Sequence, residues 1–237
     1  MKNDIEYKNL NDEEINNLDY ELAIIIDKRS YFQYYWSLLK KKQLMLFTFM
    51  PANDYNLFSI KLCLFLLSFS LYMSINGFFF SDDTMHKIHE DKGKFNIIYQ
   101  IPQILYSTII SAIINMILKL LSLSEKNIIA IKQIKDIKRL TNYSKKIKRY
   151  ITIKFIIFFI LNILFLLFFW YFISCFCAVY RNTQMILIED TLISFAISML
   201  YPFGLNLLPG ILRIPALRSQ KKDKKYLYKI STIVALI

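Results

Sequence analysis

Four long apolar blocks restrict what this chain can fold into. They run over about residues 57–80, 97–121, 150–180 and 185–208, and none holds more than two charged side chains. A helix rises 1.5 Å per residue, so roughly 20 apolar residues cross a hydrocarbon layer about 30 Å thick. The sequence therefore predicts an all-α fold, an integral membrane four-helix transmembrane bundle with cytoplasmic amphipathic and interfacial helices.

Composition supports a membrane protein and offers no sign of a disulfide framework. Hydrophobic residues make up 55% of the chain, and its first twenty residues are polar and acidic, so we expect no cleavable signal peptide. Cys63, Cys175 and Cys177 all lie inside the apolar blocks. An odd number of cysteines without paired zinc-ligand spacing indicates small packing side chains.

The distribution of basic residues predicts the orientation, because short cytoplasmic loops carry an excess of Lys and Arg. The segment between the second and third blocks holds nine: Lys126, Lys132, Lys135, Lys138, Arg139, Lys145, Lys146, Lys148 and Arg149. The segments before the first block and after the fourth are also basic, whereas the loops at 81–96 and 181–184 are acidic or nearly neutral. We expect both termini and the central loop to be cytoplasmic, facing the anionic inner leaflet of a plasma membrane or endomembrane.

We expect three regions: an amphipathic and interfacial segment over 1–56, a four-span domain over 57–213, and a basic cytoplasmic tail over 214–237. Residues 11–27 predict one amphipathic helix that Asn11 and Glu14 cap, with apolar residues at 15, 18, 22, 25 and 26. Residues 29–49 mix aromatics and lysines beside a span, which favours a lipid interface over a nucleic-acid surface. Ile128, Ile131, Ile134 and Ile137 predict that a basic amphipathic helix continues the second span. Lysines 61, 119 and 154 are expected to reach the cytoplasmic headgroups.

Polar residues recur every fourth position inside two of the blocks. They are Gln103, Ser107, Ser111, Asn115 and Lys119 in the second block, and Asp190, Ser194, Ser198 and Asn206 in the fourth. Small and amide side chains of this kind join neighbouring helices through hydrogen bonds, and we favour that role. The alternative is a polar path for an ion or small solute. Asp190 lies near the outer end of its block, where solvent could reach it.

The inner end of the fourth block is rich in helix-breaking residues, in the sequence YPFGLNLLPGILRIP. The pattern predicts a kink at Pro202 and helix termination at Pro209–Gly210, followed by a short interfacial segment. The alternative is the interrupted helix of a transporter, whose half-helix ends face an ion.

The stretch SDDTMHKIHED at 81–91 contains the candidate metal ligands Asp82, His86 and His89. Their steps of four and three place them on one helical face, but His-x-x-His with nearby acids is a loose pattern. We expect a short helix with an acidic first turn outside the cytoplasm. Histidine is the side chain whose charge changes most readily near neutral pH, so the two histidines suggest a response to an acidified lumen.

Several segments together resemble a multi-pass transmembrane module found in large, uncharacterised membrane proteins of AT-rich protists. They are DKRSYFQYYWSLLKKKQ (27–43), SINGFFFSDDTMHKIHEDKGKFNIIYQIPQILYSTIIS (74–111), LSLSEKNI (121–128) and YPFGLNLLPGILRIPALRS (201–219). The resemblance implies a membrane-embedded domain, often at the carboxy-terminal end of a surface protein. It carries over no catalytic residue.

The sequence therefore predicts a multi-pass membrane domain that anchors or assembles a larger membrane protein or complex, without enzymatic chemistry or a cofactor. Its expected partners are the bilayer and other membrane subunits or domains, and not nucleic acid. The alternative function is a channel or transporter subunit that uses the two polar stripes. A third hypothesis, a membrane enzyme with a divalent metal at His86 and His89, has less support.

Overall fold

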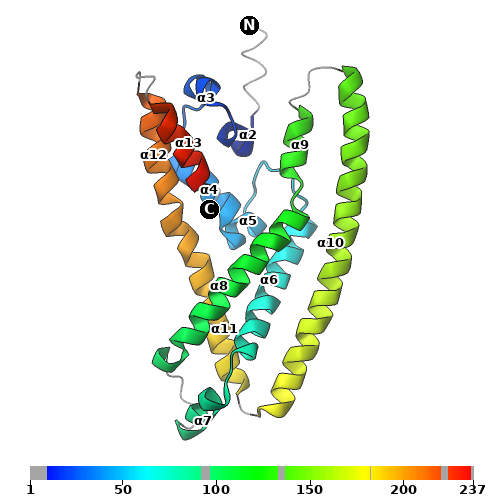
Figure 1. Cartoon of the computed structure of the whole chain (residues 1–237), viewed down its shortest axis with the longest axis vertical. Helices are drawn as coiled ribbons and strands as arrows, with labels where there is room; N and C mark the ends of the chain where they lie inside the picture. Colours follow the sequence, from blue (N-terminus) through cyan, green and yellow to red (C-terminus); the bar gives the residue numbers. More distant parts are fainter. Residues whose placement is uncertain (1–9, 92–96, 133–136, 182, 220–223, 236–237) are drawn as a thin grey trace. The chain divides into compact units, whose positions relative to one another are not determined.

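The structure is a computed structural model that describes residues 10–91, 97–132, 137–181, 183–219 and 224–235. The secondary-structure elements in these ranges are all α-helices (Figure 1). Four helical stretches are long and apolar enough to cross a membrane: Phe58–Phe78, Gln100–Lys132, Leu140–Val179 and Gln184–Arg218. The all-α class of the described residues and the four membrane-length stretches are thus confirmed. The first stretch matches its apolar block within two residues, whereas each of the other three extends about ten residues past one end of its block.

The chain forms two compact units, whose boundaries differ from the three expected regions. One unit comprises residues 56–199, and the other joins residues 1–55 with residues 200–237. The segment expected to be a tail contains the end of one helix, Leu207–Arg218, and the helix Lys225–Val234, and it belongs with the N-terminal helices. A buried ion pair and an aromatic cluster link the two ends of the chain.

The first unit contains α6 (Phe58–Phe78), α7 (Asp82–Glu90), α8 (Ile97–Ser122), α9 (Glu125–Lys132), α10 (Ile137–Val179) and most of α11 (Gln184–Leu205). Helix α6 packs against both α8 and α10. Its buried face carries small residues, including Ser70, Ser74 and Gly77. A Cβ atom at Gly77 would lie 3.3 Å from Cε1 of Phe172, so this glycine lets α6 and α10 approach closely.

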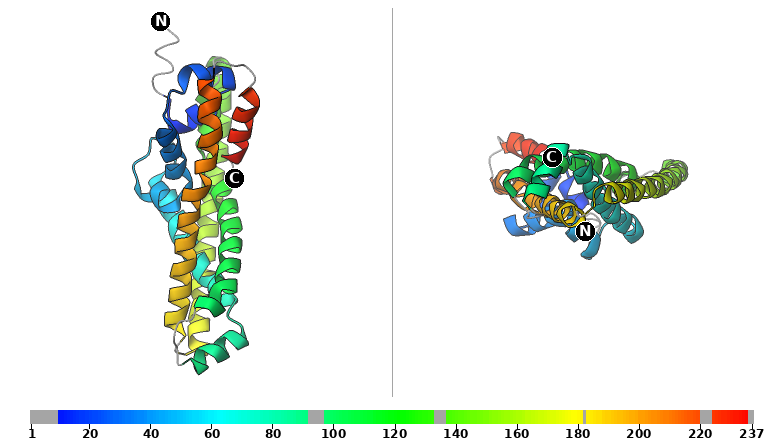
Figure 2. Two further views of the ribbon diagram at one scale, coloured as in Figure 1. Left: turned by 90° about the vertical axis from the view of Figure 1, so that its left-hand side faces the viewer. Right: turned by 90° about the horizontal axis from the view of Figure 1, so that it is seen from below.

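Helix α10 is a single long helix, coloured green to yellow in Figure 2. Most of its apolar side chains are exposed. Only 17% of its most apolar window is buried within the structure. The exposed side chains include Ile156, Ile160, Leu164, Phe168 and Tyr171. An apolar surface of this extent is rare on soluble monomers and is typical of surfaces that contact lipid or another protein.

The basic central segment divides between two helices. A break at Leu123–Ser124 separates α8 from α9, so the predicted continuation of the second span is interrupted. Lys154 of α10 closes this break, because its Nζ donates to the carbonyl oxygen of Leu123 at 2.6 Å. A cation at a helix C-terminus satisfies carbonyls that have no partner in the helix. Lys154 therefore caps α8, a role that the sequence did not predict.

Residues 145–149 lie in the N-terminal part of α10, which continues without interruption into the third apolar stretch. The basic cluster is therefore an extension of the third span. Of the expected isoleucine row, Ile134 lies outside the described residues, as does Lys135 among the basic residues.

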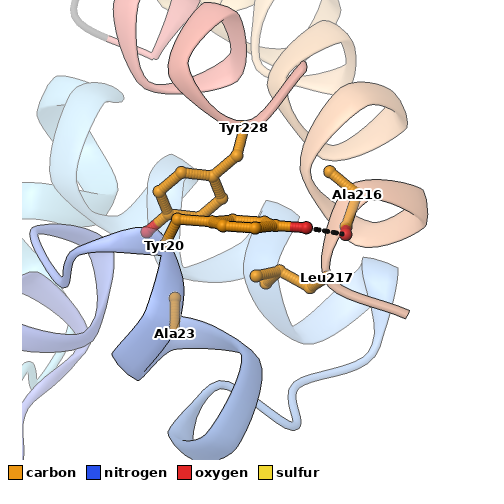
Figure 3. Packing of buried hydrophobic residues seen from close by; sticks show 5 residues of the cluster. All are labelled: Tyr20, Ala23, Ala216, Leu217 and Tyr228. Atoms are coloured by element: carbon orange, nitrogen blue, oxygen red, sulfur yellow. Dashed lines mark hydrogen bonds between the residues drawn. The ribbon is translucent and has the colours of Figure 1, made fainter. Parts of the chain in front are cut away.

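The second unit contains α2 (Asp12–Asn16), α3 (Tyr20–Ile26), α4 (Tyr31–Lys42), α5 (Leu44–Phe49), α12 (Leu207–Arg218), α13 (Lys225–Val234) and the end of α11. Helix α12 packs against α3, α4 and α13. Tyr20, Ala23, Ala216, Leu217 and Tyr228 form a buried cluster among α3, α12 and α13 (Figure 3). The ring centroids of Tyr20 and Tyr228 are 5.4 Å apart, and the Tyr20 hydroxyl donates to the Ala216 carbonyl at 3.3 Å.

The single amphipathic helix predicted over 11–27 is wrong in its continuity and its register. The capping box is present, since Asn11 and Glu14 exchange two hydrogen bonds of 2.8 Å. The helix stops at Asn16, however, and a new one begins after Asp19. Steps of three and four residues select one face only on a continuous helix. The break changes which residues face inward: Tyr20 and Ala23 are buried, whereas Ile25 is 68% exposed.

The helix break near the end of the fourth apolar block (185–208) occurs earlier than expected. Helix α11 runs through Pro202 to Leu205, and α12 begins directly after Asn206. Pro209 therefore falls in the first turn of α12, where a missing N–H costs little, and does not terminate a helix. Two tyrosines of α4 hold this break, because Tyr35 donates to the Phe203 carbonyl and Tyr31 to the Leu207 carbonyl, each at 3.0 Å.

Candidate functional site

The two polar stripes predicted on the second and fourth apolar blocks meet in a buried network. Gln103 of α8 donates from Nε2 to Oδ2 of Asp190 in α11 at 3.1 Å. The same nitrogen lies 3.3 Å from the backbone carbonyl oxygen of Asn76, near the end of α6. One amide group therefore joins three helices.

A second set of hydrogen bonds lies one helical turn further along. Ser107 of α8 donates to Ser194 Oγ of α11 at 3.2 Å. Asn76 Nδ2 donates to the same Ser194 oxygen at 3.2 Å, and to the Tyr72 carbonyl of its own helix at 2.9 Å. These bonds satisfy polar groups that burial would otherwise penalise. They also support the predicted role of the stripes as contacts between helices.

The network is enclosed by protein, and some of its atoms have no partner. Asn76, Ser107, Asp190 and Ser194 are each 0% exposed, and Gln103 is 6% exposed. Oδ1 of Asp190 and Oε1 of Gln103 make no hydrogen bond, and neither does Oγ of Ser111, among the groups that the structure describes. Asp190 is therefore buried, where we expected a solvent-accessible position near the end of its span.

The remaining stripe residues do not join this network. Asn115 and Lys119 are partly exposed. Ser198 donates to the Phe195 carbonyl of its own helix at 2.6 Å. Asn206 belongs to the other unit and donates to the Pro202 carbonyl at 2.7 Å. The stripe prediction thus identified four network members, Gln103, Ser107, Asp190 and Ser194, and missed Asn76.

The stretch 81–91 forms the short helix α7, as expected. Ser81 is the N-cap and its Oγ accepts from the Thr84 N–H at 3.2 Å, while Asp82 and Asp83 lie in the first turn. Met85 and Ile88 pack in an apolar cluster with residues of α10 and α11. The polar face is exposed, where His86 Nε2 lies 3.2 Å from Glu90 Oε1.

The candidate metal ligands do not form a ligand set. No group of three His, Cys, Asp or Glu side chains within the described ranges is arranged to hold a metal ion. Asp82, His86 and His89 share a helical face by spacing, but the nearest charged partner of His86 is Glu90.

A buried charged cluster joins the two ends of the chain in the second unit. Arg213 of α12 donates to Asp27 Oδ2 from Nε at 3.1 Å and from Nη2 at 3.0 Å. Arg29 donates to the same carboxylate from Nε at 2.8 Å and from Nη2 at 2.9 Å. Arg213 also donates to the Ile15 and Asn16 carbonyls at the end of α2, at 3.0 and 3.3 Å. The Asp27 carboxylate thus accepts hydrogen bonds from both guanidinium groups, and Arg213 also caps the C-terminal end of α2.

Two tyrosine rings enclose this cluster. The Arg213 guanidinium carbon lies 5.0 Å from the ring centroid of Tyr34 and 4.7 Å from that of Tyr228. Burial raises the pKa of Asp27, but hydrogen bonds and charges from Arg29 and Arg213 outweigh it, so the net pKa lies below its ordinary value. Burial is also the main cause of the raised pKa of Tyr34. The cluster therefore stays charged at neutral pH.

Sequence reasoning missed this cluster because it treated Arg213 only as one of the basic residues after the fourth span that indicate the orientation. The side chain is instead 1% exposed. Two lysines of the run at 40–42 also pair with protein: Lys41 with Glu13, and Lys40 with Asp12 at 3.8 Å. A usable signal was the acidic character of residues 12–27 in a chain whose other segments predicted to be cytoplasmic are basic.

No protein-family model, curated protein or solved structure matches this chain. The resemblance to a protist membrane module therefore stays a prediction.

Proposed function

We propose that this chain is a four-span integral membrane domain whose two ends are cytoplasmic, and that it anchors or assembles a larger membrane protein or complex. The observation that carries this proposal is the contrast between its surfaces. Polar side chains from α6, α8 and α11 are buried together, while apolar side chains of α10 are exposed. This distribution suits a bundle surrounded by lipid.

The pairing of the chain ends supports an anchoring role. The charge pattern assigns residues 1–56 and the segment after the fourth span to the same side of the membrane. These segments fold into one unit around Asp27 and Arg213. A folded unit that contains both chain ends offers an attachment point for neighbouring domains or subunits. The resemblance to a membrane module without known activity agrees with this role.

The anchoring proposal can be tested with a soluble fluorescent protein fused to either end of the full chain. We expect both fusions to stay with membranes after alkaline washing, with the fluorescent protein accessible only from the cytoplasm. Release of the fusions by alkaline washing would contradict membrane insertion. The soluble fluorescent protein alone is the control.

A second candidate function is a channel or transporter subunit, which the Ser107–Ser194 contact between the two polar stripes favours. Vesicles that contain the full chain would then conduct ions or a small solute, and Ser107→Leu would abolish the flux. The matched control is Ser198→Leu, because Ser198 hydrogen-bonds within its own helix. Flux that is sensitive only to Ser107→Leu would replace the anchoring proposal.

A further inference from the structure

Asp190 is a buried carboxyl group that is only half satisfied. One oxygen, Oδ2, accepts from Gln103 Nε2 at 3.1 Å, while Oδ1 has no described partner. The amide oxygen of Gln103, Oε1, also has none. Asp190 and Gln103 therefore each have one acceptor oxygen that receives no hydrogen bond, and both side chains are buried.

No described basic side chain compensates a negative charge at Asp190. In α6 the charged residue is Lys61, fifteen positions from Asn76 and so about 22 Å along the helix. In α8 it is Lys119, sixteen positions from Gln103 and about 24 Å away. The neighbouring Glu189 adds negative charge and is partly exposed.

The other elements near this end of α11 contribute either thiol and phenol side chains or exposed charged side chains. Helix α10 contributes Cys177 and Tyr180 to the cluster around Leu187. Helix α7 keeps its titratable side chains on an exposed face, and these are Asp82, Asp83, His86, Lys87, His89 and Glu90. None of them forms an ion pair with Asp190 within the described part of the chain.

A single proton satisfies both free oxygen atoms. A protonated carboxyl group has one O–H donor, and an amide offers one acceptor oxygen besides its N–H donors. If Asp190 carries the proton on Oδ1, it can donate to Gln103 Oε1 while Gln103 Nε2 donates to Oδ2. The neutral acid also removes the cost of a buried charge without a partner.

We propose that Asp190 and Gln103 form a proton-binding site, in which the carboxylic acid of α11 and the amide of α8 exchange two hydrogen bonds. The proton is the ligand, and its loss leaves an unpaired negative charge between helices. Proton occupancy therefore controls how tightly α8 and α11 associate. This inference rests on the proposed membrane insertion of these helices.

Infrared difference spectroscopy of the full chain in phospholipid vesicles tests this site, because a protonated carboxyl group has its own carbonyl stretching band. Vesicles are first washed at alkaline pH, so that failure of membrane insertion is recognised separately. We expect inserted protein to show the band at neutral pH and to lose it as the pH rises. Asp190→Asn should lack the band, whereas Glu189→Gln should retain it. Inserted protein without the band, or the band in Asp190→Asn, overturns the site.

Two further measurements test the Gln103 partner and the identity of the bound ion. Gln103→Leu removes the acceptor, so the Asp190 band should shift to the frequency of a carboxyl group without this hydrogen bond. An unchanged band in this variant contradicts the role of Gln103. Replacing Na⁺ by choline should leave the band unchanged, and a band that depends on Na⁺ would indicate a metal-cation site and overturn the proton assignment.

Discussion

Arg213 and Asp27 form a buried ion pair between residues 186 positions apart, with their closest atoms, Nη2 and Oδ2, at 3.0 Å. The side chains are 1% and 0% exposed. Arg213 also caps α2, and Arg29 shares the carboxylate. The folding of the N-terminal and C-terminal segments into one unit therefore depends on this carboxylate.

Asp27→Asn should destabilise this unit strongly, because it leaves the buried Arg213 without its counter-charge and the partly buried Arg29 with only its ion pair to Asp12. Breaking a buried pair in this way costs about 3–5 kcal/mol. The measurement is the thermal unfolding midpoint of the full chain in detergent, followed by protease sensitivity of residues 10–55. The matched control is Asp12→Asn, since Asp12 is half-exposed and its ion pair with Arg29 is worth about 0–1 kcal/mol. Equal effects of the two substitutions would contradict the assigned role of Asp27.

The same cluster predicts how stability depends on acid. The pKa of Asp27 is lowered in the folded state from its ordinary value of 3.8. Its contribution to stability is therefore fully present above that value and is lost as the pH falls through the lower pKa of the folded state. Unfolding of this unit, followed by protease sensitivity, should become easier below about pH 3.8 in the wild type. Asp27→Asn should remove this part of the acid dependence, and an unchanged acid profile in the variant would refute it.

Gly210→Ala should destabilise the contact between α12 and α4. A Cβ atom at this position would lie 2.7 Å from Cε2 and 3.0 Å from Cδ2 of the Tyr31 ring. That ring is also held by its hydroxyl bond to the Leu207 carbonyl, so it cannot move away without losing a hydrogen bond. Overpacking of this kind costs about 1–3 kcal/mol.

Gly204→Ala is the control for this prediction, because it should not lower the stability of the protein. No atom lies within 4 Å of a Cβ at Gly204, which is in helix α11. The substitution should therefore be neutral or stabilise by up to about 1 kcal/mol. Thermal unfolding of both variants in detergent provides the comparison, and a Gly210→Ala midpoint equal to or above that of Gly204→Ala would refute the close contact.

Ser194→Ala should weaken the association of α11 with α6 and α8, because Ser194 bonds to both Asn76 and Ser107. Hydrogen bonds between membrane helices are worth about 0.6 kcal/mol on average. Ser198→Ala removes a hydroxyl that bonds only within α11, so it should have a smaller effect. The readout is resistance to unfolding as the fraction of denaturing detergent rises. The network assignment fails if Ser198→Ala lowers this resistance more.

The spans were predictable because each is a local property of composition. The contact between the two polar stripes could also be predicted, since polar residues recur every fourth position along each helix. Asn76 gave no such signal, because it is a single amide at the end of an apolar block. The Asp27–Arg213 pair could not be derived locally either, because neither residue belongs to a periodic pattern and the chain must first bring α3 and α12 together. Helix breaks at 17–19 and 206 shifted the predicted registers for the same reason.

The central claim is a four-span domain with cytoplasmic ends, and site-specific labelling tests it most directly. Single cysteines are placed at Thr84 and Ser144 after Cys63, Cys175 and Cys177 are replaced by alanine. A membrane-impermeant thiol reagent is then applied to the side of the membrane opposite the cytoplasm. We predict labelling of the Thr84→Cys variant from that side, and of the Ser144→Cys variant only after the membrane is permeabilised. Labelling of Ser144→Cys without permeabilisation would contradict the proposed topology.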